Sequence, residues 1–162
     1  LSLAAAGAVQ AKAPDMGDRS GDLDLVLNLG AVIGDPPAPI DGITWYGTVE
    51  FGEVLYDIVY RTSPPVGNEV VTHWAESWQI FTLGEAGLAI EGGVVTGYDT
   101  TAVPLMTGFD TGISHMKNST WMGNGPILPA SGPFTMWEGH QSHTWGDIDF
   151  ATLTAIGTLR LN

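Results

Sequence analysis

The sequence predicts an all-β fold: an antiparallel, closed barrel of about eight strands, with a β-sandwich as the alternative. Two observations favour this class. Several segments alternate apolar and polar residues, and no window has the helical period of about 3.6 residues. The 162 residues also include 22 glycines and 10 prolines, which helix interiors exclude. We therefore expect at least seven antiparallel strands and no helix longer than about three turns.

The first two predicted strand regions lie in the amino-terminal half. From Asp22 to Gly34, leucines at every second position are separated mainly by polar residues, which is typical of a half-buried strand. The proline-rich run 35–39 ends this strand, because proline cannot donate a hydrogen bond to a neighbouring strand. From Ile43 to Arg61 the chain is rich in aromatic and β-branched residues, and it forms either one bent strand or a hairpin that turns near Gly52 and Glu53.

The clearest strand pattern runs from Glu69 to Thr82. Its two predicted faces carry Val71, His73, Ala75, Ser77, Gln79 and Phe81 on one side, and Trp74, Glu76, Trp78 and Ile80 on the other. The turn residues 84–87 predict a hairpin from this strand into Leu88–Tyr98. The regions Val103–Lys117 and Trp121–Gly123 are less regular, and strands are expected again over Gly132–Glu138 and Asp147–Leu161.

Composition limits the class of protein further. Hydrophobic residues make up 44% of the chain and charged residues 14%, as expected of one globular domain over residues 15–162. The net charge of −13 argues against nucleic acids and anionic membranes as partners. The absence of cysteine excludes disulfides and thiolate metal sites. No run approaches the roughly 20 apolar residues that a membrane span needs.

The first 14 residues, LSLAAAGAVQAKAP, are apolar and small before Lys12. Small residues two positions apart resemble a signal-peptide cleavage site, which predicts a secreted or periplasmic protein. The alternative is an apolar amino-terminal arm that is retained in the mature protein.

Two segments resemble a known family. The ending GPFTMWEGHQSHTWGDIDFATLTAIGTLRLN and the stretch SWQIFTLGEAGLAIEGGVVTG have glycine and turn spacings similar to those of small secreted barrels of the allene oxide cyclase and dirigent type. The resemblance covers Glu69 to Asn162. It implies an eight-stranded antiparallel barrel with an apolar cavity, often in oligomers, whose members act as cyclases, stereochemical guides or binding proteins. No catalytic residue of that family can be matched to a position here.

Glu76 is the candidate catalytic residue, because it lies between two tryptophans on the clearest strand. If that face points into a barrel, loss of solvent raises the pKa of the carboxyl group and suits it to general acid catalysis. In the opposite orientation Glu76 faces water, and the tryptophans lie on an oligomer surface. Hydrophobicity alone does not decide between the two orientations.

Methionine and tryptophan side chains form the candidate binding site for an apolar ligand, since methionine adapts to irregular cavities. The candidates are Trp74, Trp78, Met106, Met116, Met122, Trp121 and Trp137. We expect the Trp74–Glu76–Trp78 face and the segment from Met106 to Met122 to line one interior space. The same side chains also suit ordinary core packing.

The densest polar and aromatic segment contains His140 and His143. In a regular strand these imidazoles point to opposite faces, so we expect no stoichiometric zinc or copper site, although a turn would let them converge. Taken together, these features predict a cofactor-free barrel that binds, cyclises or isomerises a small apolar molecule. A homo-oligomer is compatible with this prediction. A structural subunit of an extracellular assembly and a histidine-based metal-binding domain are the alternatives.

Overall fold

The computed structural model describes residues 23–34, 44–51, 53–63, 66–68, 70–91, 94–99, 101–115, 117–152 and 154–162. Its elements, in chain order, are β1 (Leu23–Gly34), β2 (Thr44–Phe51), β3 (Val54–Thr62), β4 (Val66–Gly67), β5 (Val71–Thr82), β6 (Leu88–Glu91), β7 (Val94–Tyr98), β8 (Met106–His115), β9 (Thr120–Ala130), the 3₁₀ helix η1 (Gly132–Trp137), β10 (Gln141–Asp149) and β11 (Thr154–Leu161). The amino-terminal segment, including residues 1–14, lies outside the described residues.

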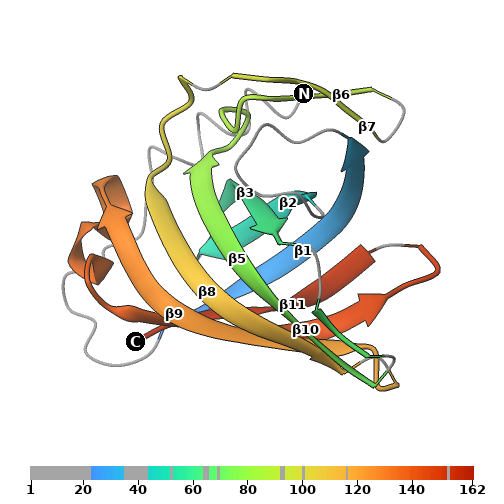
Figure 1. The fold of residues 1–162 in the computed structure, drawn as a ribbon. Coiled ribbons are helices and arrows are strands. Elements are labelled where there is room, and N and C mark those ends of the chain that lie inside the picture. Colours follow the sequence, from blue (N-terminus) through green and yellow to red (C-terminus); the bar gives the residue numbers. More distant parts are fainter. Residues whose placement is uncertain are drawn as a thin grey trace.

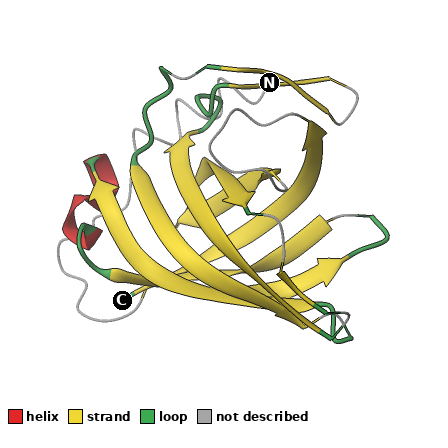
Figure 2. Cartoon of the chain, viewed as in Figure 1, coloured by secondary structure: helices red, strands yellow, loops and turns green. Residues whose placement is uncertain are grey.

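One antiparallel sheet organises the chain and curves into a barrel-like shape (Figure 1). The strand order is β11-β10-β9-β8-β5-β3-β2-β1, and β1 also pairs with β11. The β1–β11 ladder runs in antiparallel register from Leu23 opposite Leu161 to Gly30 opposite Thr154. The short β6–β7 hairpin joins this sheet through a parallel contact between β7 and the end of β1. The predicted all-β, antiparallel fold is confirmed, and η1 is the one helix among the described residues (Figure 2).

Several predicted elements differ from the observed ones. Residues 44–61 include a hairpin, in which Phe51 at the end of β2 pairs with Val54 at the start of β3. The predicted hairpin between 69–82 and 88–98 is wrong: β3 and β8 occupy the two edges of β5, so 88–98 folds on itself as β6 and β7. The regions interpreted as irregular are the long strands β8 and β9. The final segment is also a hairpin, β10–β11.

The expected strand over 132–138 is instead the helix η1. Proline at its first turn supplies the backbone angle that a helix start needs. Phe134 and Trp137 are three residues apart, so a 3₁₀ turn places both on one face, and both are buried. The Phe134 ring meets those of Phe51 and Tyr56 edge-on, with centroids 5.8 and 5.1 Å away. The helix thus covers one end of the sheet interior.

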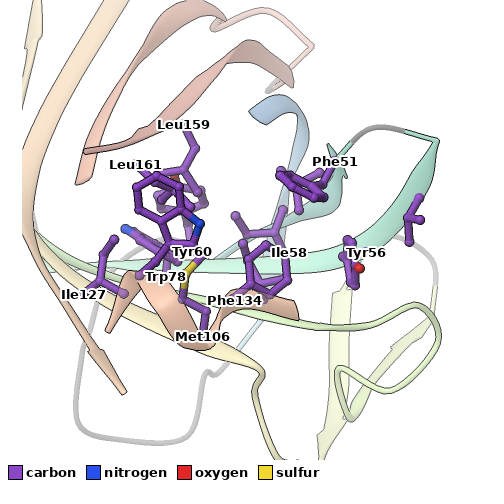
Figure 3. Close-up of a cluster of buried hydrophobic side chains, with 14 of the residues drawn as sticks. Phe51, Tyr56, Ile58, Tyr60, Trp78, Met106, Ile127, Phe134, Leu159 and Leu161 are labelled. Carbon is purple, nitrogen blue, oxygen red and sulfur yellow. The ribbon is translucent and has the colours of Figure 1, made fainter. Parts of the chain in front are cut away.

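The interior holds one continuous cluster of apolar side chains, part of which Figure 3 shows around Trp78 and Phe134. Tryptophans pack there because glycines lie opposite them. A Cβ at Gly108 would come within 2.1 Å of the Trp78 indole, and one at Gly112 within 2.7 Å of the Trp74 indole. Trp121 occupies the corresponding space over two further glycines, on β10 and β11. Large rings on one strand therefore need glycine on the next strand.

Candidate functional site

Two carboxyl groups lie side by side on the interior face of the sheet. Glu76 on β5 and Asp110 on β8 are directly opposite each other in the antiparallel register. Each residue is only 4% exposed. Glu76 reaches this position because the alternation along β5 turns Trp74, Glu76 and Trp78 inward, as one of the two predicted orientations required.

Four side chains donate hydrogen bonds to the pair. Glu76 accepts through Oε2 from Trp74 Nε1 at 2.8 Å and through Oε1 from Thr144 Oγ1 at 3.3 Å. Asp110 accepts through Oδ2 from Trp78 Nε1 at 3.2 Å and through Oδ1 from Ser142 Oγ at 3.0 Å. All four carboxyl oxygens therefore have a neutral donor, which is what burial of a carboxyl group demands.

The pair shares a proton. Burial and, to a smaller extent, the nearby charge of Asp110 raise the pKa of Glu76 from its usual 4.5 to about 8. Burial also raises the pKa of Asp110, against the opposing effect of hydrogen bonds from Glu76, Ser142 and Trp78. Two adjacent carboxyl groups do not both ionise readily. At neutral pH Glu76 is thus the acid that donates to Asp110, and the pair keeps one negative charge.

Tyr60 on β3 adds a third polar group beside the pair. Burial raises the pKa of its hydroxyl well above the usual value, and the charges of Glu76 and Asp110 raise it further. The hydroxyl lies beside Thr144, whose own hydroxyl donates to Glu76, and it is buried without a hydrogen-bond partner. Tyr60 therefore stays protonated, and its O–H group donates no hydrogen bond.

The aromatic residues of this interior differ in exposure. At one end Phe134 and Trp137 of η1 are buried over the cluster. Two further indoles, Trp45 of β2 and Trp74 of β5, pack against the same cluster but are only partly buried. Glu76 therefore lies between a partly buried indole, Trp74, and a fully buried one, Trp78.

The structure gathers most of the predicted binding residues in the interior. Trp74, Trp78, Met106, Trp121 and Trp137 all belong to the apolar cluster or pack against it. Met122 does not, since it is 51% exposed on the outer side of β9. There it lines a groove of about 520 Å³ with His73, Ile113 and Trp74. Met116 lies outside the described residues. The interior cluster therefore includes Met106 and Trp121, whereas Met122 meets Trp74 only at this groove.

The two candidate metal ligands are not brought together in a metal site. His140 precedes β10 and packs edge-on against Trp137, with ring centroids 5.4 Å apart. His143 lies within β10 and is exposed. Among the residues that the structure describes, no group of three or more histidine, aspartate or glutamate side chains could hold a metal ion. In the same part of the chain, no helix is long and apolar enough to cross a membrane.

Sequence reasoning missed Asp110 and Tyr60. The available signal for Asp110 was the segment Gly108–Gly112, which alternates two glycines with an inward aspartate opposite the Trp-Glu-Trp alternation of β5. Small residues opposite large ones are what cross-strand packing requires. Tyr60 lies on the inward face of a strand that was predicted, but nothing in its own segment indicates a carboxyl pair nearby.

Comparisons of the chain with protein-family models, with characterised proteins and with solved structures find no match.

Proposed function

We propose that the eight strands β1, β2, β3, β5 and β8–β11 form a closed barrel that binds a small apolar molecule in its interior without a cofactor. Glu76 is the proton donor when that molecule is cyclised or isomerised. The pairing of β1 with both β2 and β11 supports the closed barrel. The resemblance to allene oxide cyclase and dirigent-type barrels fits the same class of activity. Export of the protein is part of this proposal.

One observation carries the proposal: a buried carboxyl group is held between indoles in an apolar interior. Trp74 and Trp78 flank Glu76 on β5, and the group is almost fully buried. A carboxylic acid whose pKa is near the working pH donates a proton effectively in a reaction. An apolar wall favours hydrocarbon ligands and holds them in reactive conformations.

The binding half is tested with isobutylbenzene, a small neutral hydrocarbon, by titrating tryptophan fluorescence. We expect a saturable change in the wild type that is lost in Trp74→Phe, which alters the interior. The matched control is Trp145→Phe, because Trp145 is only partly buried on β10 and lies against Arg160, 5.1 Å from the guanidinium carbon. A wild type without a saturable change, or a change that depends on Trp145 alone, would contradict interior binding.

The acid half is tested with styrene oxide, an apolar epoxide that acid isomerises to phenylacetaldehyde. Glu76 protonates the epoxide oxygen as the benzylic C–O bond breaks, a hydride migrates to the benzylic carbon, and the hydroxyl proton returns to the carboxylate. We expect the wild type to convert the probe and Glu76→Gln to lose conversion while still binding isobutylbenzene. Equal conversion by both proteins would remove Glu76 from the acid role.

A further inference from the structure

The hydrogen bonds around the carboxyl pair leave one polar group without a partner. The carboxyl oxygens accept from Trp74, Trp78, Ser142 and Thr144, and the pair shares a proton. Tyr60 is only 3% exposed, and its hydroxyl has no hydrogen-bond partner. A buried donor that is left unused is unfavourable, so such a group marks a place where a bound molecule can complete the network.

The unused atom determines what a ligand must supply. Tyr60 remains protonated, because burial and two neighbouring carboxyl groups oppose its ionisation. The O–H group of Tyr60 needs a hydrogen-bond acceptor. A ligand need not supply a donor, because each carboxyl oxygen already accepts a hydrogen bond. An anionic ligand is disfavoured, because the pair keeps one negative charge. A cationic ligand would balance the negative charge of the carboxyl pair, but it would leave the Tyr60 O–H group without an acceptor.

The position of Tyr60 suits contact with a ligand that enters beside Trp45. In the register of the sheet, Tyr60 lies opposite Trp45 on β2 and opposite Trp78 on β5. Trp45 belongs to the partly buried set, whereas Trp78 is fully buried. Tyr60 therefore lies between a partly buried and a fully buried indole, and it is close enough to Glu76 and Asp110 for their charges to act on its hydroxyl.

We propose that the molecule bound in the interior is a neutral apolar compound with one hydrogen-bond acceptor, such as a ketone, whose oxygen accepts from Tyr60. This inference rests on the proposed function, since it names the chemical class that the interior site takes. Tyr60 is then the residue that selects a ketone over a hydrocarbon of the same shape.

The test compares three probes of nearly equal shape: isobutylbenzene, its ketone analogue isobutyrophenone, and the amine 2-methyl-1-phenylpropylamine. Binding is measured by calorimetry at pH 7 in the wild type, Tyr60→Phe and Tyr56→Phe. Tyr56 is the matched control, because its hydroxyl is also buried on β3 without a partner, but its pKa is raised by burial alone and not by the carboxyl pair.

We expect the ketone to bind the wild type about three- to tenfold more tightly than the hydrocarbon, the range of one net hydrogen bond. Tyr60→Phe should remove that preference, and Tyr56→Phe should keep it. The infrared carbonyl band of the bound ketone should shift to lower frequency in the wild type and return toward its free position in Tyr60→Phe. Loss of an unpartnered hydroxyl should leave folding intact, which urea denaturation checks.

The possible outcomes separate this inference from the function beneath it. If hydrocarbon and ketone bind equally, or Tyr60→Phe keeps the ketone preference, the inference is wrong and interior binding still stands. If the amine binds more tightly than the ketone, the site selects a cation and the inference is also wrong. If none of the three probes binds, the proposed function fails together with it.

Discussion

Replacing Glu76 with glutamine should make the stability of the protein less dependent on pH. The pKa of Glu76 is raised from 4.5 to about 8 in the folded protein. Between these two values the folded state therefore holds a proton that the unfolded state has released. Since stability rises with pH only where the unfolded state binds more protons, the contribution of Glu76 must fall as pH rises through this window.

The size of the effect follows from the shift. Each pH unit inside the window removes about 1.4 kcal/mol, so the wild type should lose about 3 to 4 kcal/mol between pH 5 and pH 8 through Glu76 alone. Glutamine resembles the protonated acid at every pH: its oxygen accepts from Trp74 and Thr144, and its amide donates to Asp110. The variant should therefore match the wild type near pH 5 and be the more stable protein at pH 8.

The assay is urea denaturation of the wild type and Glu76→Gln at pH 5, 6.5 and 8. The difference between the two unfolding free energies is the measured quantity, because titrating groups away from the carboxyl pair affect both proteins alike. Glu85→Gln is the control, since Glu85 is exposed in the turn after β5. Two curves that stay parallel across the pH range would refute the claim that Glu76 is held protonated.

Three other results are expected. Gly108→Ala should destabilise the protein by about 1 to 3 kcal/mol in urea denaturation, because its Cβ would lie within 2.1 Å of an indole. Gly97→Ala is the control and should change stability far less, because the nearest atom to its Cβ would be 3.4 Å away. Asp57→Asn should cost about 1 to 3 kcal/mol in urea denaturation, because the buried carboxylate accepts a 2.7 Å hydrogen bond from the turn after β5; an unchanged midpoint would contradict this. Elemental analysis should find no stoichiometric zinc or copper, and one metal per chain that disappears in a His140→Ala, His143→Ala variant would overturn that expectation.

The sequence predicted the candidate acid because β5 has a complete alternation. The large side chains of Trp74, Glu76 and Trp78 mark one face of the strand. Whether that face points inward or outward depends on the residues opposite it on the neighbouring strand. The glycines of β8 decide it, since only they leave room for indoles on the inward side. That decision is a property of two strands, and the pattern of one strand does not contain it.

Asp110 could not be found by hydrophobic alternation, because the inward neighbours on its strand are Gly108 and Gly112. An inward glycine has no apolar side chain, so β8 looked irregular although it is a long strand. The hairpin predicted from the turn residues 84–87 was wrong for a related reason. Local turn residues predict that the chain reverses, but they do not show that distant strands already occupy both edges of β5.

The central claim is that Glu76 shares a proton with Asp110 inside the sheet, and its most direct test is the titration of the Glu76 side chain. Carbon-13 NMR of protein labelled at the glutamate carboxyl carbons follows each group, and the signal that Glu76→Gln lacks identifies Glu76. We expect a midpoint near pH 8, moved to lower pH in Asp110→Asn because the neighbouring charge is removed. A midpoint close to 4.5, unchanged in Asp110→Asn, would contradict the central claim.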